Sequence, residues 1–415
     1  MRKMRDSGVD WIGQIPCGWK CCKQKYLITL LNGRAYKDSE FEEDGKYKIL
    51  RVGNLFTNPV WYSSSLELEP NKYCQDGDLL YSWSMSYAPV IWHGEKVIYH
   101  YHIWKTVLSE KISKMFAYYY LISLTNALQA EIHETTMGFI TMGVMNNAYI
   151  AFPPLAEQQR IANFLDEKCG EIDSIRSDVQ REIEILNNYK KSVITEAVTK
   201  GLNPKSKLKD SGIEWIGKIP EVWNIHPLYY YFDERKHKNI LGKERNLLSL
   251  SYGKIIRKDI DCREGLLPEN FNGYNIIEQN DIVLRLTDLQ NDKRSLRTGL
   301  VKEHGIITSA YVTLKACCDL NQSYFHYLLH SYDVMKVLYN MGNGVRQGLN
   351  YSELAKMLLI EPPLSEQKAI ADYLDEKCSE IDAIIADKQR QLETLDEYKK
   401  SLIFEYVTGK KEVPA

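Results

Sequence analysis

The sequence predicts an α+β protein built as an internal tandem duplication, in which two domains of mixed strands and helices are connected by two long helices. Two observations lead to this fold class. A segment at 153–200 recurs at 362–409, with 29 of 48 positions identical at a constant offset of 209. A shorter segment at 6–20 recurs at 210–224, with 9 of 15 positions identical. Internal repetition on this scale decides the architecture before any local assignment is made.

Each copy of the longer repeat has the pattern of one long helix. Apolar residues recur at steps of three and four, which is the spacing of a helical face and of a coiled-coil seam. Prolines at 153–154 and 362–363 cannot lie inside a helix, so each helix is expected to start just after them, and Gly201 can end the first. The predicted helix-pair seam comprises Ile161, Leu165, Ile172, Ile183, Leu186, Ile370, Leu374, Ile381, Leu392 and Leu395, on a stripe that also includes Cys169, Ile175, Val179, Val193, Cys378, Ile384 and Leu402.

The length of these helices indicates a spacer. At about 1.5 Å per residue, some 45 residues span roughly 65 Å, which is more than a domain of this size needs to cover its own core. We therefore interpret the two helices as packed on each other, with a long surface helix on its own domain as the alternative.

The shorter repeat gives both halves the same opening, DSGVDWIGQIPCGWK in one and DSGIEWIGKIPEVWN in the other. Each half then consists of this opening, a variable block and a long helix. We assign a first domain to 1–152, a first spacer helix to 153–201, a second domain to 202–361 and a second spacer helix to 362–415.

The variable blocks combine strand and helix patterns. Runs rich in β-branched and aromatic residues, bounded by Asn, Gly and Pro, predict strands, and longer apolar runs near the end of each block predict helices. The match of DGDLLY at 76–81 with QNDIVL at 279–284 indicates that the blocks share a fold although they have diverged. The expected strands are 47–52, 78–83, 96–101, 246–251 and 281–286, and the expected helices are 116–127 and 324–338.

Composition is that of an ordinary globular protein. The 415 residues are 44% hydrophobic and 26% charged, with a net charge of −2, so total charge gives no indication of a nucleic-acid partner. The N-terminus has no apolar stretch of a signal peptide, and no run suits a membrane span, so we expect a cytoplasmic protein. Nine cysteines without a Cys-x-x-Cys motif argue against a disulfide framework and a zinc site.

The repeated motifs resemble those of one known family. A DSG-x-x-WIG-x-IP opening, a variable domain and a PPL-x-EQ-x-x-IA-x-x-LDEK helix ending in KKS, followed by the same three parts again, is similar to the specificity subunit of type I restriction-modification systems. The resemblance covers the whole chain, and the doubled PPL-x-EQ helix is specific to it.

The resemblance implies a role in reading DNA. The variable blocks would be target recognition domains, each reading one half of a bipartite site in double-stranded DNA, and the long helices would pair antiparallel with pseudo-twofold symmetry. Duplex geometry then sets a half-site separation near one turn, about 34 Å. The subunit would have no catalytic site or cofactor of its own. It would dock two modification subunits, which bind S-adenosylmethionine, and restriction subunits in the full complex.

Candidate DNA contacts are polar or aromatic side chains next to predicted turns. Arg, Lys, Asn and Gln read base edges, and the polar run after the strand at 281–286 concentrates them. In the first block the equivalent loop is neutral and aromatic, so its residues could equally be packing residues; GFITMG at 138–143 also departs from the GVRQG of 344–348, where the resemblance places DNA contacts. The candidates are Arg34, Tyr36, Lys37, Arg51, Asn54, Trp83, Tyr87, Arg285, Gln290, Asn291, Lys293, Arg294, Arg346 and Gln347.

Two other classes of function, an enzyme and a protein-binding scaffold, are alternatives to DNA recognition. A fused methyltransferase needs a Gly-rich cofactor loop and an Asn-Pro-Pro-Tyr type motif, and the sequence has neither. A metal-dependent nuclease could use Glu221, Glu234 and Lys236, but Cys17 stands in the first repeat where Glu221 stands in the second. We therefore expect no catalytic residue and no metal site. The remaining alternative is a two-lobed scaffold that binds proteins and not DNA.

Overall fold

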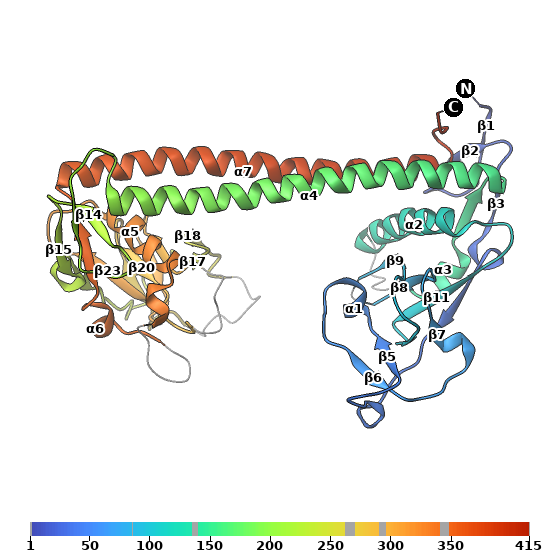
Figure 1. Cartoon of the computed structure of the whole chain (residues 1–415), viewed down its shortest axis with the longest axis horizontal. Coiled ribbons are helices and arrows are strands. Elements are labelled where there is room, and N and C mark those ends of the chain that lie inside the picture. The colour runs from blue at the N-terminus through green and yellow to red at the C-terminus, as the bar shows by residue number, and fades with distance from the viewer. Residues whose placement is uncertain are drawn as a thin grey trace. The chain divides into compact units, whose positions relative to one another are not determined.

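The structure is a computed structural model that describes residues 2–84, 86–134, 140–261, 270–289, 296–340 and 348–414 (Figure 1). The chain forms two compact units, one of Met1–Gln180 with Gln389–Ala415 and one of Arg181–Lys388. Each unit therefore combines one variable block with one half of each long helix. We refer to them as unit 1 and unit 2. Within the described residues, no helix is both long and apolar enough to cross a membrane.

Unit 1 contains a hairpin, a strand pair and two four-stranded sheets. The opening repeat forms the antiparallel hairpin β1–β2, and β3 pairs antiparallel with β12, the strand just before α4. One sheet has the order β4-β11-β8-β9 and the other β6-β5-β10-β7. The elements are β1 (Met4–Asp6), β2 (Gln14–Pro16), β3 (Lys20–Lys23), β4 (Ile28–Asn32), β5 (Tyr47–Leu50), α1 (Val52–Phe56), β6 (Tyr62–Ser64), β7 (Tyr73–Cys74), β8 (Leu79–Ser82), β9 (Ala88–Ile91), β10 (Val97–Tyr99), β11 (Ile103–Leu108), α2 (Lys114–Glu134), α3 (Met142–Asn147) and β12 (Tyr149–Phe152).

Unit 2 repeats this plan. It has the hairpin β13–β14, the antiparallel pair β15–β24 before α7, and a sheet of order β16-β23-β20-β21 that corresponds to β4-β11-β8-β9 of unit 1. Two further strand pairs, β17–β18 and β19–β22, complete it. The elements are β13 (Leu208–Asp210), β14 (Lys218–Pro220), β15 (Asn224–Pro227), β16 (Phe232–Glu234), β17 (Leu248–Ser251), β18 (Lys254–Arg257), β19 (Asn275–Ile277), β20 (Ile282–Leu284), β21 (Thr298–Leu300), β22 (Gly305–Ile307), β23 (Val312–Ala316), α5 (Gln322–Val334), α6 (Tyr351–Leu354) and β24 (Leu358–Glu361).

The two long helices are α4 (Leu155–Lys200) and α7 (Leu364–Val407), and both begin directly after their proline pairs. They run antiparallel, because in unit 1 Lys399 of α7 pairs with Asp173 of α4 at 2.6 Å, and in unit 2 Lys190 of α4 pairs with Asp382 of α7 at 2.6 Å. An offset of 209 turns one of these ion pairs into the other. The fold class predicted from sequence, an α+β tandem duplication with two long antiparallel helices, is confirmed.

The two variable blocks share a local turn at the matched segments 76–81 and 279–284. Asp78 and Asp281 each precede the matching strands β8 and β20, and each carboxylate accepts a backbone N–H from the residue three positions earlier, at 2.9 and 2.8 Å. The preceding residues, Gly77 and Asn280, both have positive φ, at 81° and 71°. Asn is one of the few residues besides Gly that adopts this conformation readily. The same turn therefore forms with Gly77 in unit 1 and with Asn280 in unit 2.

The helix predicted at 324–338 ends earlier than expected. α5 ends at Val334, and Lys336 has φ 64°, a left-handed conformation that cannot continue an α-helix. A separate 3₁₀ turn at Val337–Asn340 follows. The helix predicted at 116–127 is α2, which extends to Glu134. Within the predicted strand segments the structure has strands with ends that differ by one or two residues, and Val52 begins α1 where the sequence favoured a strand.

A candidate DNA interface on a repeated frame

The PPL-x-EQ motif joins each variable block to its long helix. In unit 1 Glu157 accepts a hydrogen bond from the indole N–H of Trp19 at 3.2 Å, and in unit 2 Glu366 accepts one from Trp223 at 3.0 Å. Both tryptophans belong to the opening repeat and are buried. The two repeated motifs, far apart in sequence, therefore meet in the same way in each unit.

The glutamine of the motif makes a second connection. Gln158, which is fully buried, donates to the carbonyls of Pro153 and Lys111 and accepts the backbone N–H of Ser113, at 2.8–2.9 Å. Gln367 in unit 2 donates to Pro362 at 2.9 Å and accepts the N–H of Asn321 at 2.9 Å. Each glutamine thus joins the start of a long helix to the segment that begins the block's own helix, α2 or α5.

The LDEK motif adds a third connection. Tyr119 of α2 donates its hydroxyl proton to Asp166 of α4 at 2.7 Å, and Tyr327 of α5 donates to Asp375 of α7 at 2.7 Å. Burial, together with the neighbouring carboxylate, raises the pKa of both tyrosines well above the usual range, so both remain donors at physiological pH. The Trp–Glu, Gln and Tyr–Asp contacts are together called the frame contacts.

The predicted seam residues differ in burial. Seven are at most 7% exposed, and the nearby Ile175 and Ile384, which lie on the same sequence stripe, are 50% and 47% exposed. An α-helix has 3.6 residues per turn, so a residue three positions along the stripe can leave a narrow two-helix contact. The buried seam residues are Ile161, Leu165, Ile172, Ile183, Ile370, Leu374 and Ile381, and the half-buried ones are Leu186, Leu392 and Leu395.

Five candidates of the first block lie in two segments, Arg34, Tyr36 and Lys37 before the 3₁₀ helix Asp38–Glu40, and Arg51 and Asn54 at the start of α1. Arg34 forms a bidentate ion pair with Glu40, at 3.1 Å for Nη1, and its guanidinium lies 5.2 Å from the ring centroid of Tyr36. Asn54 uses its amide to hold a loop, because it donates to the carbonyls of Asn58 and Val60 and accepts the N–H of Arg51. Arg34 and Asn54 thus have structural partners already.

Arg51 and Lys37 are exposed in unit 1. The guanidinium of Arg51 lies 5.1 Å from the centroid of the Tyr62 ring. The backbone N–H of Lys37 donates to Glu40 at 2.8 Å. Both residues keep their charge at the surface, where it could contact phosphate.

The aromatic candidates of unit 1 belong to a cluster after β8. Trp83 donates its indole N–H to the carbonyl of Tyr101 at 2.8 Å and stacks on Trp104, with ring centroids 5.6 Å apart. Tyr87 is half-buried against the core of unit 1. His102 lies edge-on to Trp83, with centroids 5.2 Å apart. Trp83 is therefore partly a packing residue.

The histidines of this cluster are neutral at physiological pH. Burial lowers the pKa of His100 to about 4, with smaller contributions from His102 and from the Arg51 charge. Burial, followed by Arg51, also lowers the pKa of His102. The surface around Trp83 therefore combines neutral aromatic rings with the charge of Arg51, which acts on both histidines. Sequence reasoning missed His100, Tyr101 and His102, although the run of aromatic residues that directly follows β10 was a visible signal.

In unit 2 the structure places Arg285 directly after β20, half-buried, with its backbone N–H donating to the carbonyl of Arg297 at 2.9 Å. The backbone N–H of Leu349 donates to Leu286 at 2.9 Å, so the segment after 341–347 is tied to the loop that starts at Arg285. Six candidates lie outside the described residues: Gln290, Asn291, Lys293, Arg294, Arg346 and Gln347.

The end of each long helix differs between the units. In unit 1 Tyr406 stacks on Phe164, with ring centroids 4.5 Å apart. The equivalent residues in unit 2 are Ala197 and Tyr373, and a cavity of about 570 Å³ lies beside them. Val193, Leu202 and Leu208 are among its other lining residues. The missing aromatic ring leaves space in unit 2 that unit 1 fills with its own side chain.

No group of three or more His, Cys, Asp or Glu side chains that could hold a metal ion occurs in the described parts of the chain. Of the residues considered for a nuclease above, Glu234 pairs with Lys236 at 2.8 Å.

Comparison with known proteins gives consistent matches. The family described as type I restriction modification DNA specificity domain matches residues 16–185 and 266–394. The MjaVIII specificity subunit of a type I restriction enzyme from Methanocaldococcus jannaschii is 26% identical over 81% of this chain and 79% of its own length. The putative MjaX specificity subunit from the same organism is 24% identical over 96% of this chain and 95% of its own length.

A solved structure has the same fold. It comes from work on the structural basis of complex assembly and conformational transition of the type I R-M system. It superimposes with a TM-score of 0.69 at 14% identity and covers 96% of this chain and 99% of the other.

Proposed function

The chain belongs to the type I restriction-modification DNA specificity family and is a specificity subunit with two target recognition domains, and from this premise we propose that each block reads one half of a bipartite DNA target. The observation that carries this proposal is the contrast within the duplication. The frame contacts are the same in both units, whereas the loops after β8 and β20 carry different chemistry. A frame that stays constant under two different surfaces suits a protein that must read two different sequences.

The two surfaces would read DNA in different ways. The loop after β20 begins with Arg285, and a guanidinium can make a bidentate contact to guanine. The surface after β8 offers Trp83, Tyr101 and neutral histidines near Arg51, which suits apolar contact with bases and one phosphate contact. The boundaries of the recognition domains, 1–152 and 202–361, are part of this proposal.

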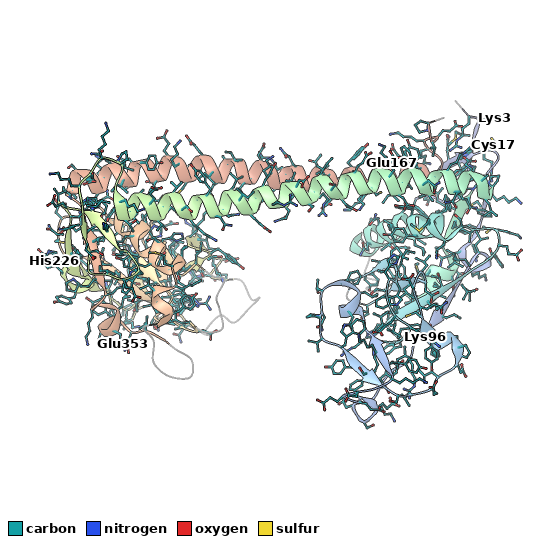
Figure 2. All side chains as sticks on the ribbon, in the orientation of Figure 1. Lys3, Cys17, Lys96, Glu167, His226 and Glu353 are labelled. Carbon is teal, nitrogen blue, oxygen red and sulfur yellow. The ribbon has the colours of Figure 1, made fainter. Side chains whose placement is uncertain are left out.

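The helix pair would set the distance between the half-sites and dock the modification subunits. Each unit carries the same outward apolar residues, Ile175 and Tyr398 in unit 1 and Ile384 and Tyr189 in unit 2, and all four are 47–56% exposed. Exposed charged residues lie on the same helices, and one of them, Glu167 of α4, is labelled in Figure 2. Two equivalent surfaces support two modification subunits, one at each unit.

The chain itself would be non-catalytic. Methyl transfer to adenine, with S-adenosylmethionine as donor, would take place on the modification subunits, and cleavage on restriction subunits in the full complex. The role of this chain is then to place the modification subunits on one DNA sequence.

The test is methylome sequencing of a methylation-free bacterial host that expresses the chain together with its neighbouring modification subunit. We expect new adenine methylation at a single split motif, with the modified bases of the two halves on opposite strands. A control host that expresses the modification subunit alone should show no such motif. A stable complex without any motif, and without salt-dependent DNA binding, would favour the scaffold that does not bind DNA.

A further inference from the structure

The loop after β20 is built around a buried arginine. Arg297 is fully buried, directly before β21. Its Nη1 donates to the carbonyls of Arg285 at 3.2 Å and Thr287 at 2.8 Å, and its Nη2 donates to the carbonyl of Asp288 at 3.1 Å. Three backbone carbonyls of one short loop therefore converge on a single guanidinium.

The rest of the guanidinium is held from the opposite side. Nε donates to the hydroxyl of Tyr339 at 3.2 Å, and the guanidinium lies 5.3 Å from the centroid of that ring. The backbone N–H of Arg297 donates to the buried carboxylate of Asp333 at 2.7 Å. A buried charge is costly unless its hydrogen-bonding groups are satisfied. Replacement of Arg297 by an apolar residue would therefore leave these carbonyl groups without their hydrogen-bond donor.

The geometry of the loop depends on these bonds. Asp288 has φ 57°, a left-handed conformation that a residue with a Cβ rarely adopts without support. The carbonyls on both sides of Leu286 are tied to Arg297, and Leu286 itself accepts the N–H of Leu349. Arg297 thus fixes the loop at the point where the segment following Arg346 and Gln347 joins it.

Unit 1 has no buried arginine at the position equivalent to Arg297. Strand β21 pairs with β20 as β9 pairs with β8, and the register places Arg297 opposite Arg285 and Ala88 opposite Ser82. The side chain of Ala88 has no hydrogen-bond donor to offer the loop after β8. That loop is instead held by the indole of Trp83, which donates to Tyr101 at 2.8 Å.

We propose that Arg297 is a positioning residue for the second half-site: it holds the backbone from Arg285 to Asp288 so that this loop can read bases. This inference rests on the proposed function. Arg297 does not contact DNA, because it is buried beneath the loop. It acts by fixing the loop's shape before binding, which reduces the ordering cost of recognition.

The test compares half-sites within one complex. Arg297→Lys keeps the positive charge but has a single ammonium group, which cannot reproduce the planar fork that reaches three carbonyls and a hydroxyl. The complete complex with modification subunits is assayed for methylation rate on the intact target and on two duplexes, each with one base pair changed in one half-site. The ratio of rates gives a discrimination factor for each half-site.

We expect Arg297→Lys to lower the discrimination factor of one half-site by roughly five- to hundredfold, the range of one bidentate base contact, and to leave the other unchanged. Arg257→Lys, an exposed residue of unit 2 that pairs with Glu303, is the matched control and should change neither factor. Unchanged factors for Arg297→Lys, or an equal fall in both, would overturn the inference.

A milder variant covers the case in which Arg297→Lys prevents assembly. Tyr339→Phe removes the hydroxyl that accepts from Nε of Arg297 and from Nζ of the exposed Lys336, and should lower the same single factor by a smaller amount. If Tyr339→Phe lowers neither discrimination factor, or lowers both equally, the inference is also overturned. The two proposals fail differently: a wild-type complex that methylates no motif contradicts the proposed function, whereas a wild-type complex with two readable half-sites and an unaffected Arg297→Lys contradicts only the role of Arg297.

Discussion

Unit 1 and unit 2 are alike where the variable block meets the long helices and different where the block faces outward. Trp19 and Glu157 meet as Trp223 and Glu366 do, with N–O distances of 3.2 and 3.0 Å. By contrast, Ala88 stands where Arg297 does, at the base of the loops that follow β8 and β20. One buried pair inside the long helices also differs, because Ala197 stands where Tyr406 does. The difference teaches that sequence identity in this duplication marks the contacts that build the frame, whereas the surfaces carried by the frame are free to change.

The largest effect is expected from the buried tryptophans of the frame. Trp223→Ala removes a fully buried indole and its bond to Glu366, and should lower the free energy of unfolding of unit 2 by about 3–5 kcal/mol. Trp19→Ala should do the same in unit 1. Hydrogen exchange, measured separately for β13–β14 and β1–β2, would show whether each loss stays in its own unit. Loss of protection in both units from one substitution would break the comparison.

The ends of the long helices give the next effect. Tyr406→Ala should cost unit 1 about 3 kcal/mol, because it opens beside Phe164 the space that unit 2 already has. The reciprocal Ala197→Tyr should change the stability of unit 2 by less than about 1.5 kcal/mol, since the ring enters an existing cavity. Chemical denaturation followed by hydrogen exchange in each unit measures both. Equal costs for the two substitutions would contradict the proposed equivalence.

The loops after β8 and β20 are compared by DNA binding. Arg285→Ala should weaken binding of the complex to its cognate DNA by about 1–3 kcal/mol if the side chain makes a bidentate base contact. Arg257→Ala provides an exposed arginine of the same unit as control. Affinity is measured at one fixed salt concentration, because phosphate contacts make affinity depend on salt. Unchanged affinity and an unchanged methylation motif would remove Arg285 from the interface.

Acid should weaken both units through histidines that the fold keeps neutral. Burial, with smaller contributions from His326 and the Lys190 charge, lowers the pKa of His330 to about 3, and burial is the main cause that lowers the pKa of His100 to about 4. A histidine near its ordinary value of 6.5 takes up a proton in the unfolded chain first, so stability falls as pH drops from about 6.5 towards 4. His330→Gln should flatten this loss in unit 2 and leave it in unit 1. Denaturant titrations at pH 7 and pH 5 would measure this loss of unfolding free energy. If His330→Gln left the loss in unit 2 unchanged, His330 would not be its source.

The smallest effect concerns the equivalent ion pairs between the helices. The partly exposed pairs Asp173–Lys399 and Asp382–Lys190 should each contribute at most about 1 kcal/mol. Double-mutant cycles in the two units should give the same coupling energy within a few tenths of a kcal/mol. A clear difference would show that the helix pair is not equivalent at its two halves.

Much of the frame could be predicted from the sequence. The doubled segments gave the two long helices, and the proline pairs gave their first residues, because a proline is excluded from a helix interior and the next residue is free to begin one. The turn before β8 and β20 was visible in the shared Asp78 and Asp281. These features depend on residues close together in the chain, where local rules apply.

The site was less predictable because its contacts join distant residues. Nothing near Glu157 indicates that its partner is Trp19, which lies 138 residues earlier. Arg297 follows a charged run and reads as a solvated residue, yet it is fully buried. Ile175 and Ile384 fit the apolar stripe but are about half exposed. This exposure could not be predicted, because the stripe does not show how wide the contact with the second helix is.

The strand pairs β3–β12 and β15–β24 place the start and the end of each variable block next to each other. Lys20 lies opposite Phe152, and Asn224 lies opposite Glu361. A block whose two ends are neighbours can be replaced as a cassette, because a new block needs only to enter on one strand and leave on the other. Exchange of one block at both of its ends would change the proposed half-site specificity and leave the long helices, with their proposed docking surfaces, unchanged.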